Sequence, residues 1–254
     1  MKSIQIVLVL FAIVLHSLNS LAQQIESRYW YVEKIEVKQK KTTDFENHLS
    51  RLATAFVEES FPHTYNVCKN KDNIYYIFHE ISGISEIDEI KAIKKQAIEN
   101  IRLTRAYNKC IESTNTFVIR DLPELNYIPI EPRLLWEEVG FTSWELHTVE
   151  QDHLDTYKDK LHDFQSVKDY FHYNDPSFVF EIIEAPDTPT IALMSYARNQ
   201  IDRKNEDSRI WQVLGPEGRI LFENLNPYIL DRKYIEFWKL NEVSYIAQAA
   251  EESL

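Results

Sequence analysis

Two stretches of the sequence, separated by 112 residues, share one hydrophobic pattern, and this repetition limits the fold more than any other feature. The offset places Phe45 on Tyr157 and Leu49 on Leu161 without a gap. Each stretch runs from aromatic and β-branched residues into apolar residues at helical spacing, which predicts a strand followed by a helix. Because solenoid repeats are only about 20 to 50 residues long, the offset indicates duplication of a whole module. Coincidence is the alternative, since few residues are identical.

The first half predicts the element order β-α-β-β-α-β. Thr43 and Glu46 have the spacing of a capping box, which predicts that Thr43 is the N-cap of the first helix. Pro62 ends this helix, because proline is not tolerated in a helix interior. The polar turn "NKDN" predicts a hairpin between two strands. The predicted strands are residues 29–38, 64–69, 73–81 and 133–139, and the second helix begins near residue 85.

The second half repeats this order. Apolar residues at helical spacing predict one helix between Leu154 and Phe171 and another through Ile210. The latter ends at Gly215, because glycine accepts the left-handed conformation and a proline follows. We interpret the similar phrases "NYIPIEPRLLW" (126–136) and "NPYILDRKYIEFW" (226–238) as the approach to, and the body of, the fourth strand in each half. The predicted strands are residues 142–149, 177–184, 190–197 and 234–240.

The element order resembles the dimeric α/β-barrel superfamily, which includes the antibiotic-biosynthesis-monooxygenase and NIPSNAP types. The stretches "YWYVEKIEVK...DFENHL" and "SWELHTVEQ...YKDKL" carry the resemblance. It implies an α+β fold in which tandem duplicated ferredoxin-like units pack sheet to sheet as an intrachain α/β barrel. It also implies a lumen that binds a small hydrophobic or haem-like ligand, and oxygenase activity in some members. Haem-degrading members use an Asn, a Trp and a His, and no complete set matches here, so that activity is not carried over.

Residues 1–22 have the pattern of a secretory signal peptide. Lys2 precedes the apolar run "IQIVLVLFAIVL", and "SLA" supplies small residues where cleavage is expected. An uncleaved membrane anchor is the alternative, but the run is shorter than the roughly 20 residues that cross a bilayer. We therefore expect a soluble periplasmic or secreted protein, without stable membrane insertion after cleavage. Residues 23–139 would form the first unit and residues 140–254 the second.

Composition limits the partners. The chain has 40 acidic and 28 basic residues, a net charge of −12, which disfavours nucleic acid because phosphate binding needs a basic surface. It has only four glycines, which disfavours loops that cradle phosphates. Cys68 and Cys110 are the two cysteines. In an exported protein they form either a disulfide or two free thiols, and the sequence leaves both open.

Four polar residues are candidates for binding a ligand. Glu33 and Glu145 occupy equal positions under the 112-residue offset. His147 lies on the same strand face as Glu145, because side chains alternate along a strand. Together with His79 on another strand, they are predicted to line one lumen, where a carboxylate beside an imidazole is poised for proton transfer near neutral pH. A water-facing position at the sheet margin is the alternative.

Two tryptophans, Trp136 and Trp238, are predicted to form apolar walls of the same site, with ordinary core packing as the alternative. No metal site is predicted. The histidines between residues 153 and 172 lie among aspartates, but both alternate with the apolar residues of a helix, as on a solvated helix face.

The predicted function is binding of a small hydrophobic or aromatic ligand between two sheets, by an exported soluble protein without a recognisable catalytic motif. Two alternatives stay open: a haem-linked or cofactor-independent monooxygenase-like enzyme, and a protein–protein interaction module that uses exposed aromatic strand faces. The residues themselves predict no cofactor, and haem enters only through the resemblance. Homo-oligomerisation is also left open.

Overall fold

The computed structural model describes residues 28–58, 60–183 and 188–245. The predicted signal peptide, residues 1–22, lies outside the described residues. Within the described ranges, no helix combines the length and apolar character that a membrane crossing requires.

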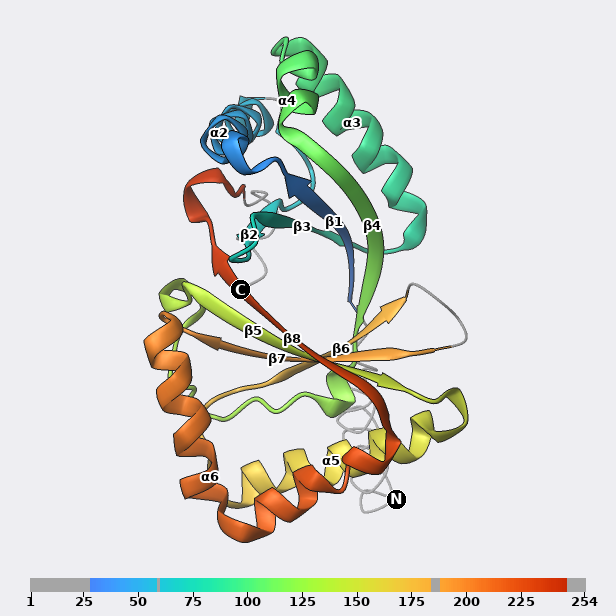
Figure 1. Cartoon of the computed structure of the whole chain (residues 1–254), viewed down its shortest axis with the longest axis vertical. Helices are drawn as coiled ribbons and strands as arrows, with labels where there is room; N and C mark the ends of the chain where they lie inside the picture. Colours follow the sequence, from blue (N-terminus) through green and yellow to red (C-terminus); the bar gives the residue numbers. More distant parts are fainter. Residues whose placement is uncertain (1–27, 59, 184–187, 246–254) are drawn as a thin grey trace, which may run out of the picture.

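Eight strands of the described residues close into one barrel, and every neighbouring pair is antiparallel (Figure 1). Their order is β1-β3-β2-β8-β5-β7-β6-β4. The four strands of each half are therefore contiguous, and the halves meet where β2 pairs with β8 and β4 pairs with β6. This confirms the predicted α+β barrel. The strands are β1 (Tyr29–Val37), β2 (Asn66–Lys69), β3 (Ile74–Ile81), β4 (Ile111–Asp121), β5 (Phe141–Val149), β6 (Phe178–Ile183), β7 (Thr190–Ala197) and β8 (Ile229–Lys239).

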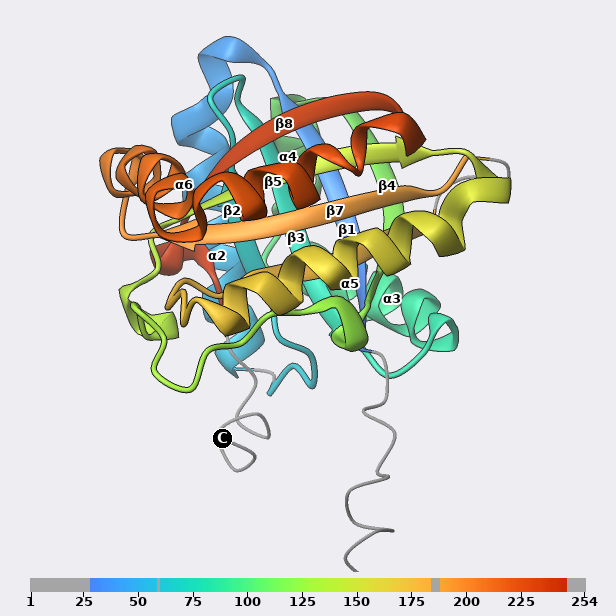
Figure 2. The ribbon, with the colours of Figure 1, turned by 90° about the horizontal axis from the view of Figure 1, so that it is seen from below.

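The helices lie outside the barrel. Helices α2, α3 and α4 lie beside the strands of the first half, and α5 and α6 lie beside those of the second half (Figure 1 and Figure 2). Helix α6 is interrupted at Gly215, whose φ is 60°, and it resumes at Pro216 because proline is tolerated in a first helical turn. The helices are α2 (Thr42–Glu58), α3 (Ile87–Asn100), α4 (Thr104–Cys110), α5 (Leu154–Tyr170) and α6 (Gln200–Glu223).

Each strand of the barrel presents one face to the interior and one to the helices, because side chains alternate. On β1, Tyr31 and Ile35 pack with Phe45 and Leu49 of α2. Val32, on the opposite face of β1, belongs to a separate apolar cluster inside the barrel. Odd-numbered residues of β1 therefore face helices, and even-numbered residues face the interior.

The predicted fourth strand of the first half is wrong. The fourth strand is β4, which follows the unpredicted helix α4, whereas residues 133–139 are irregular apart from a short 3-10 turn at Trp136–Glu138. Pro129 and Pro132 precede this segment and lack the backbone donors that a central strand needs. The phrases 126–136 and 226–238 thus do not correspond in the structure, because only the second contains a strand.

The predicted capping box is also wrong. Helix α2 begins at Thr42, so Thr43 lies inside it. The carboxylate of Glu46 accepts hydrogen bonds from the hydroxyl of Tyr75 and the ammonium of Lys69, and this ties α2 to the sheet.

The two cysteines are free thiols. Cys68 lies on β2 and Cys110 ends α4. The structure thus favours the thiol alternative over the disulfide.

Candidate functional site

The barrel interior is packed with aromatic and aliphatic side chains. Trp144 stacks on Phe180 with ring centroids 5.9 Å apart and meets Phe237 edge-on at 5.5 Å. Trp30 contacts Phe180 edge-on at 5.4 Å. The predicted placement of Glu33, His79, Glu145 and His147 in one lumen is therefore wrong. All four point outward toward helices, and they form two separate clusters, one in each half.

The first cluster is a buried ion pair beneath α3. Lys94 of α3 donates to both carboxylate oxygens of Glu33, at 2.7 and 2.8 Å, and His79 Nε2 lies 3.2 Å from the same carboxylate. Burial acts to raise the pKa of Glu33, but Lys94 and His79 outweigh it and lower this pKa to about 2. Burial likewise acts to lower the pKa of Lys94, and Glu33 raises it to about 12. Both side chains are thus charged and mutually neutralised.

The surroundings of this ion pair are packed. His79 is fully buried, stacks on Tyr31 at 5.8 Å and meets Tyr65 edge-on at 5.4 Å. Burial lowers the pKa of His79 below its ordinary value, with Glu33 opposing. The sequence correctly paired a carboxylate with an imidazole, but the pair lies under α3, within packed aromatic rings.

The second cluster lies between β5, β8 and α5. His147 Nδ1 lies 2.6 Å from the hydroxyl of Tyr157, and its Nε2 lies 2.8 Å from Glu145. Glu145 also accepts a hydrogen bond from the hydroxyl of Tyr234 at 2.9 Å and lies 3.2 Å from Arg232. Burial acts to raise the pKa of Glu145, but the His147 hydrogen bond and the other partners lower it below its ordinary value. The contact between Glu145 and His147 confirms that they share a strand face.

A cavity of about 670 Å³ lies next to this second cluster. Its walls are the outward face of the second-half sheet, helices α5 and α6, and the turn between β2 and β3. Tyr76 of β3 and Ile235 of β8, which belong to the interior cluster, also line it. The apolar residues of the wall include Leu161, Phe164, Leu193, Ile210, Trp211 and Phe222. The polar residues include Glu145, Gln165, Lys168, Ser177, Arg203 and Tyr234. Of the four polar candidates from the sequence, only Glu145 lines this cavity.

Lys168 is the most unusual group of the cavity wall. Its Nζ donates to Ser177 Oγ at 2.8 Å, and Ser177 in turn donates to Gln165 Oε1 at 3.1 Å. The ammonium lies 4.8 Å from the centre of the Phe164 ring, a cation–π distance. Burial lowers the pKa of Lys168 to about 7, with Asp175 opposing and the nearby Arg203 adding to the effect.

Sequence reasoning missed Lys168, although one signal was present. It lies seven residues after Leu161 and four after Phe164, and this helical spacing places it on the apolar face of α5. Because a lysine is almost never fully buried unless it is paired, a lysine at such a position marks an unusual environment.

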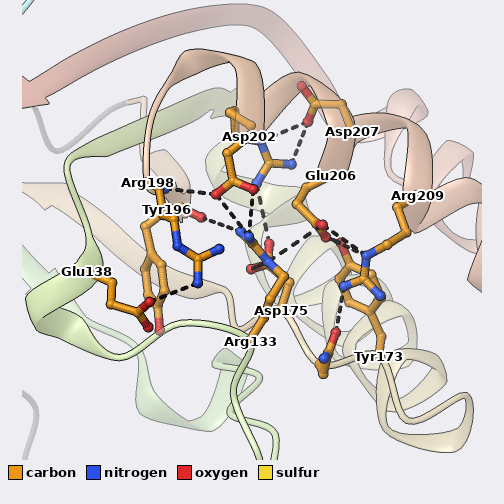
Figure 3. Close-up of polar contacts among 12 residues, drawn as sticks. Arg133, Glu138, Tyr173, Asp175, Tyr196, Arg198, Asp202, Glu206, Asp207 and Arg209 are labelled. Atoms are coloured by element: carbon orange, nitrogen blue, oxygen red, sulfur yellow. Dashed lines mark hydrogen bonds and ion pairs between the residues drawn. The ribbon is translucent and has the colours of Figure 1, made fainter.

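An ion-pair network fixes α6 and the loop that follows α5 to the segment between the halves (Figure 3). Arg133 donates to both oxygens of Asp202 on α6, at 2.8 and 2.9 Å, and to Asp175 at 3.2 Å. It also lies 3.6 Å from Glu206, which Arg209 approaches to 2.7 Å. Sequence reasoning assigned these residues no role. The spacing of Asp202 and Glu206, four residues apart on one helix face, is the signal that was available.

The two predicted tryptophans do not line the cavity. Trp136 is 49% exposed on the irregular segment, where Lys239 Nζ lies 4.5 Å from its ring centre. Trp238 lies on β8 and contacts the ring of Phe141 edge-on at 5.4 Å. Trp136 was predicted on a strand, which is wrong because the strand itself is absent. Their role in ligand binding stays a prediction without a place in this cavity.

Comparison with known proteins supports the fold. No family model matches the sequence, and no curated protein matches it. Among solved structures, an anthrone oxidase-like protein matches with a TM-score of 0.60 at 7% identity, over 89% of this chain and 95% of that chain. A candidate monooxygenase from Lactobacillus acidophilus matches with a TM-score of 0.54 at 7% identity, over 87% and 97%. A mutant chlorite dismutase from Candidatus Nitrospira defluvii matches with a TM-score of 0.55 at 6% identity, over 85% and 92%.

These similarities establish the fold alone, because the identities are so low. The chain has the α/β-barrel fold of these proteins over most of its length, as the resemblance implied. The NIPSNAP-type relationship stays a prediction.

The cavity wall does not suit the iron of a haem. The wall residues of the described chain include no histidine, cysteine or methionine side chain. His147 is near, but Tyr157 and Glu145 engage its two ring nitrogens. Burial and the neighbouring Glu145 raise the pKa of Tyr234, which disfavours a phenolate ligand. The side chains of the cavity wall therefore suit an apolar ligand better than they suit a haem.

Proposed function

We propose that this protein binds a small ligand with an apolar or aromatic body in the cavity between the second-half sheet and helices α5 and α6. The observation that carries the proposal is the cavity itself. Its volume of about 670 Å³ lies within the range of small-molecule sites, roughly 300 to 1,000 Å³. Its wall combines apolar and aromatic side chains, which can cover the body of a ligand, with many polar and charged side chains, which can fix its orientation.

A pair of tryptophan variants tests this assignment. Ser195 lines the cavity, so Ser195→Trp should fill it. Thr114→Trp is the matched control, because Thr114 is exposed on β4. Aromatic ligands that raise the melting temperature of the wild type should raise that of the control equally and leave that of Ser195→Trp unchanged. Ligand binding that survives in Ser195→Trp would place the ligand elsewhere.

A cofactor-independent, monooxygenase-like enzyme is the second candidate function. The fold shared with a candidate monooxygenase and an anthrone oxidase-like protein favours it. Oxygen uptake with anthrone as the probe tests it, with Ser195→Trp as the cavity-blocked control. A haem titration followed by reductant, monitored at the Soret band, tests the haem-linked version, and we expect no saturable binding.

We also propose that the protein is exported and that the barrel arose by duplication of one ferredoxin-like unit. The lengths of β1 and β5 agree, as do those of α2 and α5, at the same offset of 112 residues. The pairing of β1 with β4 and of β5 with β8 shifts register at equivalent places, Glu36/Val37 and Thr148/Val149. N-terminal sequencing of the secreted protein tests export, and the expected first residue is Gln23.

A further inference from the structure

Lys168 differs from the other buried cations of the described chain. Lys94 and Arg203 are also buried, and each makes an ion pair: Lys94 with Glu33, and Arg203 with Asp175. Lys168 is 5% exposed and forms no ion pair with any carboxylate of the described residues. Its hydrogen-bond acceptor is the neutral hydroxyl of Ser177.

An unpaired cation in an apolar interior is unfavourable, because burial removes water and no negative charge replaces it. Lys168 nevertheless lies at the wall of a cavity rather than in solid packing. Ser177 and Gln165 line the cavity beside it and form a hydrogen-bonded chain with it. The apolar wall residues Phe164 and Leu161 adjoin this polar group on the same face of α5. The part of the wall that α5 contributes thus presents a cation next to apolar surface.

We propose that the ligand of this cavity is an aromatic or branched apolar acid whose single anionic group binds Lys168 Nζ. This inference rests on the proposed function and specifies its ligand. The anion supplies the charge that Lys168 lacks, and a charge-assisted hydrogen bond to an ammonium is about twice as strong as a neutral one. The body of the acid lies against Phe164 and the other apolar residues of the wall.

The other charges of the wall favour a ligand with one negative charge. Four carboxylates, Asp72, Glu145, Asp207 and Glu236, also line the cavity, against two further cations, Lys71 and Arg203. Arg203 is already committed to Asp207 and Asp175. Lys71 is exposed in the turn between β2 and β3, where solvent and salt screen its charge. A second anionic group on the ligand would therefore meet mainly carboxylates, and it would be repelled.

Two ligands of equal shape and different charge test the proposal. Naphthoate carries a carboxylate, and naphthalenemethanol replaces it with a neutral hydroxyl. Calorimetric titration measures the affinity of both ligands for the wild type, Lys168→Met and Lys160→Met. The titration is done at about pH 6.5, below the pKa of Lys168 of about 7, so that the lysine is mostly charged. Lys160 is the control because it lies on α5 and pairs with Asp163 at the surface.

We expect the wild type and Lys160→Met to bind naphthoate roughly tenfold or more tightly than the alcohol. Lys168→Met should lose this preference while still binding the alcohol, which also shows that the variant is folded. Equal wild-type affinities for acid and alcohol would overturn the charge assignment and leave the cavity assignment standing. A preference that persists in Lys168→Met would overturn it too. If neither ligand binds the wild type, and no other aromatic ligand does, the proposed function itself fails.

Discussion

The two halves of the barrel have the same strand order, but they differ in how the space between the sheet and its helices is filled. In the first half, α2 and α3 cover the sheet with a continuous apolar cluster that includes Phe45, Leu49 and Phe56. In the second half, α5 and α6 leave a cavity of about 670 Å³ against the sheet. Figure 1 shows α6 running along one side of the second-half strands and then turning below them, after its break at Gly215. One half is built for packing and the other retains space.

The two halves also differ in how they accommodate a buried lysine. Lys94 in the first half is neutralised by Glu33, and its pKa is raised to about 12. Lys168 in the second half has no such partner, and burial lowers its pKa to about 7. The two lysines thus differ in whether the protein itself supplies the neutralising charge. The following substitutions test this contrast, beginning with the largest expected effect.

Lys94→Met should lower the free energy of unfolding by about 3 to 5 kcal/mol, because it leaves the carboxylate of Glu33 buried without its ion-pair partner. Urea denaturation measures the loss. Lys95→Met, at an exposed position of the same helix, is the control and should change stability by less than about 0.5 kcal/mol. A loss for Lys94→Met as small as the control's would show that the ion pair is not structural.

Leu49 and Leu161 occupy equivalent positions on α2 and α5, and both are fully buried. Leu49→Ala should cost about 3 to 5 kcal/mol, because it opens a new void in a packed cluster. Leu161→Ala should cost about 2 to 3 kcal/mol, since Leu161 already borders empty space and loses fewer contacts. The same urea experiment measures both. Equal costs would mean that the cavity is closed in solution.

Lys168→Met should raise the free energy of unfolding near neutral pH and below, whereas the substitutions above lower it. Between about pH 7 and the ordinary pKa of 10.5, unfolded Lys168 binds a proton that the folded side chain does not. The free energy of unfolding of the wild type therefore gains a contribution that rises with pH across this window and is absent below it. At pH 6 the variant should be more stable than the wild type by about 1 to 3 kcal/mol. This advantage should shrink toward pH 10, and parallel pH profiles would contradict it.

The elements with strong local patterns were predictable. The segment before Val37, the helix through Leu49 and their counterparts 112 residues on carry aromatic, β-branched and apolar residues at clear periods. β4 was missed because its first half, "IESTNT", is polar and exposed, so it shows no apolar alternation. Its position is set by pairing with β1, which is a tertiary contact.

The sequence of one strand did not predict whether the candidate residues face the barrel interior or the helices. β1 carries aromatic side chains on both faces, with Trp30 toward the interior cluster and Tyr31 toward the helices. Alternation therefore showed that Glu145 and His147 share a face but not which face it is. The cavity depends on how far α5 and α6 stand from the sheet, and local sequence does not encode that distance. Only the charge of Lys168 within an apolar face pointed to it.

Glu145→Gln is the substitution with the smallest expected effect on stability, and it contrasts with the equivalent Glu33. The partners of Glu145, Tyr234 and Arg232, reach solvent, and glutamine keeps an acceptor for His147, so the cost should stay below about 1 kcal/mol. Glu33→Gln should cost about 3 kcal/mol or more, because it strands the buried charge of Lys94.

Ligand affinity should also distinguish Glu145→Gln from Glu33→Gln. Glu145 lines the cavity, so removing its charge should tighten naphthoate binding by roughly twofold to fivefold through reduced repulsion. Naphthalenemethanol affinity should stay the same, since that ligand is neutral. Glu33→Gln, which alters the packed half, should change neither affinity once the protein is folded. If Glu145→Gln leaves naphthoate binding unaltered, Glu145 supports His147 and the sheet without facing the ligand, and the cavity's anion selectivity depends on Lys168 alone.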